Sequence, residues 1–268
     1  MSRILLTVEY DGTAYAGWQR QLNGLAVQQV MEERLSALCG EEIRITGASR
    51  TDAGVHARGQ RAHFDTACRI PPEKYPFALN TMLPPDIRVT EGRAVPGGFH
   101  ARFMTCGKLY TYRILNRRHA SAILRNTYAH VPVSLDVDRM RRAAGTLIGK
   151  HDFAAFQAAG GTARTTVRTV REASLTLDGD ALVFTVSGDA FLYNMVRIIA
   201  GTLIEIGHGK RGEDAFLRAF ESLNRLDLGP TAPAHGLELT RVDYPDAAFV
   251  NPDGIRWHRE AREMEERS

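Results

Sequence analysis

The 268-residue sequence has a formal net charge of +3, and 44% of its residues are hydrophobic, which is enough for a folded core. The charged fraction of 24% is ordinary and excludes a disordered chain. Three widely spaced cysteines fit no zinc motif and predict free thiols in a reducing compartment. The sequence shows no signal peptide, and its most apolar stretch, 191–206, contains charged residues. We therefore expect a soluble cytoplasmic protein without a membrane span.

The first part of the sequence predicts the element order βαββαβ. Strands are indicated by short β-branched runs, and helices by apolar residues three and four positions apart. Gly40 is expected to end the first helix. In chain order the predicted elements are strand Ile4–Tyr10, helix Val27–Cys39, strands Ile43–Gly47 and Arg61–Asp65, helix Glu73–Met82 and strand Ile87–Thr90.

The same order recurs in the second part of the sequence. Asp136 is expected to cap a helix that runs to Ile148, and Asp178-Gly179-Asp180 predicts a tight hairpin turn between two strands. The predicted elements are strand Leu109–Leu115, the helix after Asp136, strands Val170–Leu177 and Ala181–Ser187, a long buried helix Ala190–Ile206 and strand Leu237–Val242.

This repetition predicts an α+β protein made of two ferredoxin-like halves, which are also RRM-like. Each half is expected to form an antiparallel sheet with helices on one face, and a cleft is expected between the halves. The predicted domains are residues 1–104, which carry the candidate catalytic loop, residues 105–250, and a charged tail at 251–268.

The stretch Ile45–Gln60, between the second and third predicted strands, contains one acid, Asp52. Arg50 and Arg58 flank it at short distance in the sequence, and glycine and alanine surround it. Small neighbours would let a bulky substrate approach, and cations favour the ionised carboxylate, which can act as a nucleophile or a base. The structural alternative is a glycine turn held by an Asp–Arg ion pair.

Other chemistry in this stretch is less favoured. A triad of Ser49, Asp52 and His56 would not easily line up within one short loop, and His56 with His63 lacks a third metal ligand at a suitable spacing. No nucleotide-binding glycine fingerprint follows a strand, so we expect no nucleotide cofactor.

Two aromatic motifs could contact RNA. In EYDGTAYAGWQRQ, Trp18 lies beside amides and an arginine and could stack on a base, or it could be buried under a loop. In GKLYTYRI, Tyr110 and Tyr112 share one strand face. Tyr110 could pack on a base or transfer a proton, and cross-strand packing is the alternative.

Arg197 lies on an otherwise apolar predicted helix. A buried arginine requires a carboxylate or phosphate partner. Asp52 is one candidate partner, and a structural pairing with Asp189 or Glu205 is the alternative.

Taken together, these motifs resemble the TruA family of tRNA pseudouridine synthases. The matching segments, in chain order, are EYDGTAYAGWQRQ, SRTDAGVHARGQ, FHARF, KLYTYRI, HDFAAFQ, RTTVRTV and AFLYNMVRIIAGTLIEIG. The resemblance implies isomerisation of uridine to pseudouridine at positions 38, 39 and 40 in the anticodon stem-loop of tRNA. It also implies a homodimer with no metal or organic cofactor. Departures from the family pattern at Asp189 and Glu238 bear on local packing, and Ser49 in place of a frequent glycine is a change of one small residue for another.

The resemblance also implies residue roles. Asp52 would be the catalytic aspartate, and Tyr110 would contact the target uracil. Arg50 would pair with Asp52 and hold the target nucleotide out of the stack, and Arg197 would supply a further basic partner for the carboxylate.

Three chemical routes remain open at this point. Asp52 could attack C1′, attack uracil C6 or remove a C2′ proton, and each route requires an ionised carboxylate and an unstacked base. Two other protein classes compete with this interpretation: a non-catalytic RNA-binding protein built from two RRM-like sheets, and a small-molecule hydrolase that uses Asp52 or His56. The first would need exposed aromatic residues on its central strands, and no RNP-type run is present.

Overall fold

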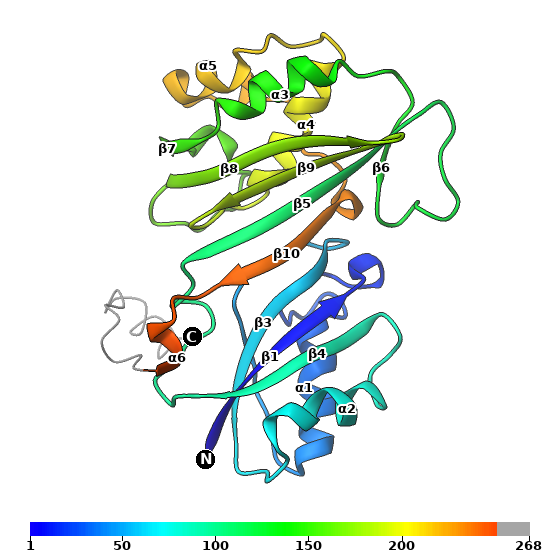
Figure 1. Cartoon of the computed structure of the whole chain (residues 1–268). Helices are drawn as coiled ribbons and strands as arrows, with labels where there is room; N and C mark the ends of the chain where they lie inside the picture. The colour runs from blue at the N-terminus through cyan, green and yellow to red at the C-terminus, as the bar shows by residue number, and fades with distance from the viewer. Residues whose placement is uncertain (251–268) are drawn as a thin grey trace. The chain divides into compact units, whose positions relative to one another are not determined.

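The computed structural model describes residues 1–250, and the predicted charged tail lies outside them (Figure 1). The chain divides into two compact units. Unit 1 is Met1–Cys106 with the residues from Arg241 onward, and unit 2 is Gly107–Thr240. The predicted domains 1–104 and 105–250 remain a prediction, as does the cleft between the halves.

Unit 1 is an antiparallel sheet with two helices. Its strands lie in the order β4-β1-β3-β2, and α1 and α2 pack against each other on one side of them. The elements are β1 Ser2–Tyr10, η1 Gly12–Ala14, α1 Val27–Cys39, β2 Thr46–Gly47, β3 His56–Thr66, η2 Pro72–Lys74, α2 Tyr75–Asn80, β4 Ile87–Val95 and, at the end of the described chain, α6 Ala247–Val250.

Unit 2 contains a longer sheet in the order β10-β5-β9-β8-β7, and its short strand β6 pairs in parallel with β5. α3 packs on α4 and on β8. The elements are β5 Gly107–Asn116, β6 Ala129–Val131, α3 Val137–Gly145, β7 Gly149–Asp152, η3 Ala154–Phe156, β8 Val167–Asp178, β9 Ala181–Gly188, α4 Met195–Gly207, α5 Ala215–Ser222, η4 Arg225–Asp227, η5 Ala234–Gly236 and β10 Leu237–Asp243, whose residues from Arg241 onward are counted with unit 1. The chain is therefore a mixed α+β protein with mostly antiparallel strands.

The predicted bounds of helix α1 are confirmed, and Gly40 ends the helix in the left-handed conformation with φ 69°. The buried positions of α1 include an acid, Glu32, which is 3% exposed. Its carboxylate accepts hydrogen bonds from Arg20, Arg44 and the backbone N–H of Ile45. Because a buried charge needs such partners, Glu32 fixes the chain that enters the candidate site against α1.

Several predicted boundaries were wrong. Strand β2 is limited to Thr46–Gly47, and β3 begins at His56 rather than Arg61. The helix predicted to start at Ala190 starts at Met195, because Asn194 has a positive φ of 61°. The side chain of Asp136 caps α3 as predicted, but α3 ends at Gly145, and β6, β7 and α5 were not predicted. Within residues 1–250, every helix is too short or too polar to span a lipid bilayer.

The core of unit 1 contains a neutral histidine, His63, on β3. Burial lowers the pKa of His63 from 6.5 to about 3, with smaller contributions in the same direction from His100 and Arg3. The backbone N–H of Ala101 donates to its Nδ1 over 3.2 Å, which also requires that nitrogen to be unprotonated.

We expect His63 to make unfolding sensitive to mild acid. The unfolded chain binds a proton near pH 6.5 that the folded chain resists, so this contribution is present above pH 6.5 and is lost as the pH falls toward 3. Relative to His63→Gln, the wild type should lose about 2–3 kcal/mol of unfolding free energy between pH 7 and pH 4.5. Urea titrations at both pH values measure this difference. Parallel pH profiles for the two proteins would contradict it.

Candidate active site

Asp52 lies in a short loop between β2 and β3. Because β3 begins at His56, the loop is restricted to residues 48–55, and Arg58 and Gln60 lie on the strand instead of in the loop. The backbone N–H of Val55 donates to the carbonyl of Asp52 over 3.1 Å, which closes a turn with Gly54 at φ 76°. The Asp52 side chain is half-buried at the start of this turn.

A fully buried glutamine holds the first half of the loop. Gln60 on β3 donates from Nε2 to the carbonyl of Ser49 over 2.6 Å, and its Oε1 accepts from the Ser49 N–H over 3.2 Å. The phenol of Tyr10 hydrogen-bonds the hydroxyl of Thr51 over 2.7 Å. These contacts fix the backbone on the N-terminal side of Asp52. Sequence reasoning missed the role of Gln60, since nothing in the sequence pairs it with Ser49.

The segment after β1 supports the second half of the loop. The N–H of Trp18 donates to the carbonyl of Thr51, and the N–H of Gly54 donates to the carbonyl of Tyr15. Two glycines allow this approach: a Cβ on Gly12 would lie 2.0 Å from the carbonyl oxygen of Val55, and one on Gly17 would lie 2.3 Å from that of Thr51. The EYDGTAYAGWQRQ motif is therefore a scaffold for the Asp52 loop.

Trp18 itself is buried, with 2% of its surface exposed, and it stacks on Tyr10 with ring centroids 5.9 Å apart. The hypothesis that Trp18 stacks on an RNA base is therefore wrong, because neither face of its ring is open to a ligand. The alternative considered from the sequence, a tryptophan buried under a loop, is confirmed.

His56 connects the start of β3 to the segment after β1. Nδ1 of His56 accepts a hydrogen bond from the N–H of Gly12 over 3.0 Å, and the ring is 7% exposed. This nitrogen is therefore used in holding the loop to η1. Across the described residues, histidine, cysteine, aspartate and glutamate side chains do not gather into a group of three able to hold a metal ion.

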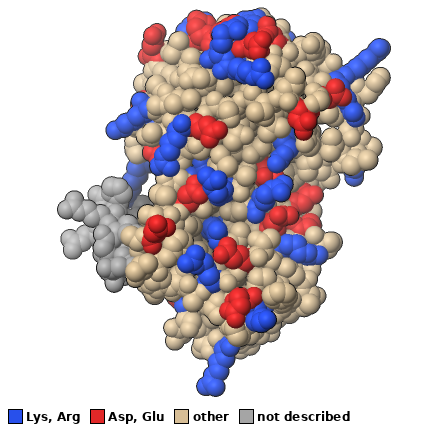
Figure 2. All heavy atoms as spheres, viewed as in Figure 1, with Lys and Arg blue, Asp and Glu red and all other residues tan. Residues whose placement is uncertain are grey.

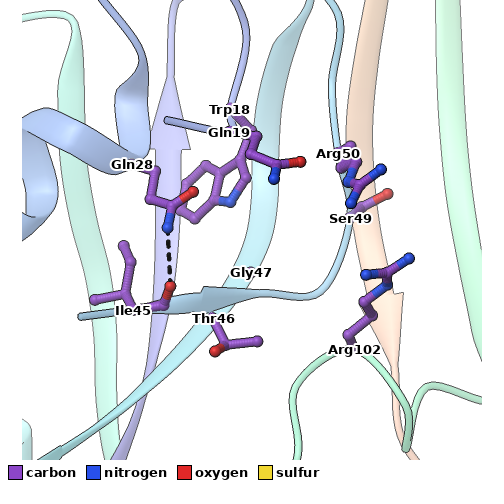
Figure 3. Close-up of a pocket in the computed structure, with 9 residues that line it drawn as sticks. All are labelled: Trp18, Gln19, Gln28, Ile45, Thr46, Gly47, Ser49, Arg50 and Arg102. Carbon is purple, nitrogen blue, oxygen red and sulfur yellow. Dashed lines mark hydrogen bonds between the residues drawn. The ribbon is translucent and has the colours of Figure 1, made fainter. Parts of the chain in front are cut away.

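Arg50 differs from its expected arrangement. Its side chain is exposed, and within residues 1–250 it forms no hydrogen bond or ion pair, with Asp52 or with any other residue. Instead it lines a polar hollow in unit 1 with a volume of about 170 Å³ (Figure 3). Within residues 1–250 no ion pair joins Arg50 to Asp52, and the expected role of Arg50 toward the substrate stays a prediction.

Tyr110 and Tyr112 lie in unit 2, on β5, opposite Val186 and Phe184 of β9. Tyr110 is 7% exposed and packs edge-on against Phe191, with ring centroids 5.1 Å apart. Tyr112 is fully buried, and its hydroxyl donates to the carbonyl of Pro233 over 2.9 Å. Burial raises the pKa of Tyr112. Tyr112 is thus a packing residue.

Arg197 lies in the first turn of α4 in unit 2. It donates from Nε to the carbonyl of Ala232 over 2.8 Å and from a terminal nitrogen to Oδ1 of Asn194 over 2.8 Å. The alternative structural pairings are not formed: Asp189 accepts from the backbone N–H groups of Thr169 and Ala190, and Glu205 pairs with Arg211. Ala232 and Asn194 are thus two of the residues that orient the Arg197 side chain, and its role beside the carboxylate stays a prediction.

The hydrogen bonds between Gln60 and the Asp52 loop predict that substitution of Gln60 lowers the stability of the folded protein. Gln60→Met keeps the side-chain length but leaves the buried N–H and C=O of Ser49 without their partner. We expect the free energy of unfolding to fall by about 2–4 kcal/mol. The matched control is Gln29→Met on α1, which loses a surface hydrogen bond to Glu33 and should cost under about 0.5 kcal/mol. Equal urea midpoints for the two variants would refute the bracing role.

The surface charge in one view is mixed. Figure 2 shows Lys and Arg side chains interspersed with Asp and Glu side chains on the face drawn, without one continuous basic area. On this face, any contact with an anionic substrate would involve particular arginines rather than a broad positive surface.

Comparison with a protein-family model places this chain in a class of RNA-modifying isomerases. A family model described as tRNA pseudouridine synthase matches residues 6–104 and 143–245. The matched residues include the Asp52 loop and all of α4, whereas β5 lies outside them. Pseudouridine synthases are isomerases, and membership of this family makes the chain an isomerase.

The relatives define the family further. The chain is 50% identical over 245 residues to tRNA pseudouridine synthase A of Ruminiclostridium cellulolyticum, which covers 91% of this chain and 100% of the relative. It is 48% identical over 252 residues to the protein of the same name from Halalkalibacterium halodurans, which covers 94% and 96% of the two chains. The chain belongs to the TruA family of tRNA pseudouridine synthases.

Similar solved structures are more distant. An archaeal box H/ACA sRNP Nop10-Cbf5 complex matches with a TM-score of 0.36 and 11% identity, covering 75% of this chain and 44% of that one. An H/ACA RNP bound to a substrate RNA containing 2′-deoxyuridine matches with a TM-score of 0.38 and the same identity and coverage.

Proposed function

We propose that this chain converts uridine to pseudouridine at positions 38, 39 and 40 in the anticodon stem-loop of tRNA, with Asp52 as its single catalytic aspartate. The observation that carries the proposal is the braced turn at Asp52. Its backbone is fixed on both sides by Gln60, Tyr10 and the segment after β1, while Ala53 and Gly54 leave the carboxylate with small neighbours. A fixed carboxylate that a large substrate can approach is what this isomerisation requires.

The proposed isomerisation consumes no second substrate and no redox equivalents. The N1–C1′ bond breaks, the uracil turns, and a C5–C1′ bond forms while the C5 proton leaves and N1 gains one. Substrate and product are isomers, so no redox carrier is needed. Asp52 could attack C1′, attack C6 or remove a C2′ proton, and all three routes use an ionised carboxylate. The target base must leave its stack, which costs a few kcal/mol and costs least in a loop or at a stem end.

The roles of the other candidate residues belong to the same proposal. Tyr110 contacts the target uracil, and Arg197 supplies a basic group for the carboxylate or for the substrate. The edge-on contact of Tyr110 with Phe191 and the two contacts of Arg197 with Ala232 and Asn194 support fixed orientations for both side chains. We further propose two ferredoxin-like halves, supported by the order βαββαβ in unit 1, and a homodimer acting on tRNA in the cytoplasm.

The test maps pseudouridine in tRNA from cells with and without the gene for this chain. We expect pseudouridine at positions 38, 39 and 40 to be lost and to return with a plasmid copy. Retention of all three modifications in the deleted strain would reject the proposal. Loss at a different tRNA position would retain the enzyme class and reject the position.

A further inference from the structure

The polar hollow of unit 1 has a composition suited to an anion. It is lined by Trp18, Gln19, Gln28, Ile45, Thr46, Gly47, Ser49, Arg50 and Arg102. Two of these residues are arginines, and none is acidic. Gln19 and Gln28 carry side-chain amides, and Thr46 and Ser49 carry hydroxyls. Its volume of about 170 Å³ is well above the roughly 10–15 Å³ that a cavity needs, in the same measure, to hold one water. The hollow therefore has room for a group larger than a single water.

The two arginines reach the hollow from separate segments. Arg50 comes from the Asp52 loop, and Arg102 follows β4 in a turn where its backbone N–H donates to Nδ1 of His100 over 3.1 Å. In Figure 3 the Arg102 side chain extends toward Ser49 and Arg50. Two guanidinium groups beside one polar hollow attract a group with several acceptor oxygens, because they bring positive charge to one place and a guanidinium suits the geometry of a phosphate.

The floor of the hollow is rigid. Gln28 donates to the carbonyl of Ile45 over 3.1 Å and to Glu32 over 2.9 Å. The indole of Trp18 packs so closely on Gly47 that a Cβ there would lie 2.2 Å from the indole nitrogen. In contrast, the Gln19 and Arg50 side chains form no hydrogen bond within residues 1–250. Fixed walls with donors still available describe a preformed site.

We propose that this hollow binds one backbone phosphate of the tRNA strand, and that Arg50 and Arg102 hold this phosphate together. The inference rests on the proposed function and deepens it by giving Arg50 a phosphate rather than Asp52 as its partner. A phosphate suits the hollow better than a base, because the buried ring of Trp18 leaves no face for stacking. Since Arg50 is two residues from Asp52, the phosphate belongs to the strand that carries the target nucleotide.

The test compares the salt dependence of tRNA binding by the full-length chain. Each phosphate contact contributes about 0.7–0.9 to the slope of log K against log salt. We expect Arg102→Gln and Arg50→Gln each to weaken binding about tenfold and to lower the slope by part of this amount. The double variant should lower the slope by about 0.7–0.9, one phosphate, and weaken binding less than the product of the two single effects. If the two arginines contacted two separate phosphates, the double variant would lower the slope by about 1.4–1.8, and the losses in binding free energy of the two single variants would add. That result would overturn the shared site.

The matched control is Arg34→Gln on α1. Arg34 is exposed, lies outside the hollow and changes the net charge equally. We expect its slope to equal that of the wild type. If Arg34→Gln lowers the slope as much as Arg102→Gln does, the effect comes from general charge and the inference fails. Pseudouridine formation by the wild-type chain is measured in parallel, so failure of the proposed function is recognised separately from an unchanged slope.

Free phosphate is the competing source of the same chemistry, and Trp18 can report on it. The sequence has two tryptophans, so Trp257→Phe leaves Trp18 as the single emitter at the hollow. We expect tRNA to change Trp18 fluorescence, and Arg102→Gln to reduce that change. Saturation by millimolar inorganic phosphate, with loss of the tRNA response, would assign the hollow to free phosphate and overturn the RNA assignment.

Discussion

Asp52→Asn is expected to bind tRNA and to release no measurable tritium from C5-labelled uridine within it. The amide has nearly the same shape as the carboxylate but is neutral, so it can neither attack carbon nor accept a proton efficiently. The turn itself uses the backbone carbonyl of Asp52, which the substitution preserves. We therefore expect a loss of at least about 10⁴-fold in kcat. Asp52→Ala should behave in the same way.

The control for this prediction is Glu33→Gln. Glu33 is an exposed acid of unit 1 on α1, where it accepts a hydrogen bond from Gln29. Its variant removes one carboxylate of the same unit and should retain wild-type turnover. Turnover by Asp52→Asn at a rate near that of Glu33→Gln would reject Asp52 as the catalytic residue, whatever the modified position in the tRNA.

Gly17→Ala is expected to damage both stability and catalysis. Gly17 has φ 99°, where L-residues are strained, and its new Cβ would meet the carbonyl oxygen of Thr51 at 2.3 Å and the carbonyl carbon of Asp52 at 3.1 Å. The strain costs about 1–3 kcal/mol. Because backbone atoms cannot rotate away, the Asp52 loop must shift, and a shift of about 1 Å can cost about 10²-fold in kcat.

Gly40→Ala separates these two effects. Gly40 also has a positive φ, 69°, but its Cβ position meets no heavy atom within 4 Å apart from those of its own stretch of chain. It should therefore share much of the stability loss and keep kcat near the wild-type value. Equal kcat for both variants, measured well below their unfolding midpoints, would contradict the claim that Gly17 positions the loop.

Local signals predicted some elements well. The bounds of α1 follow from its apolar spacing and Gly40, and the cap of α3 follows from the side chain of Asp136. In contrast, β3 extends back to His56 because it pairs with β1, where Val8 lies opposite Gln60 and Tyr10 opposite Ala57. Such pairing joins residues far apart in the sequence, so no local pattern indicates it.

In the candidate site, too, local features were predictable from the sequence and contacts between distant segments were not. The small residues around Asp52 indicated a loop, and the structure places Asp52 in one. The hollow lined by Arg50 was not predictable, because Arg102 joins its lining from a distant segment of the chain. Gly12 and Gly17 offered a signal that was not used: glycines after a strand indicate a close approach of another backbone, which in this fold is the Asp52 loop.

The division of unit 1 into two chain segments has a consequence for the order of folding during synthesis. The end of the described chain completes unit 1: the Tyr244 hydroxyl donates to the carbonyl of Ala101, and Phe249 stacks on Phe99 with centroids 5.6 Å apart. Unit 2 is continuous, Gly107–Thr240. As the chain leaves the ribosome N-terminus first, unit 2 has all of its residues available before unit 1 does. The residues that brace Asp52 all precede unit 2 in the chain, whereas the aromatic cluster at Phe99 is completed only after Tyr244 and Phe249 have been made.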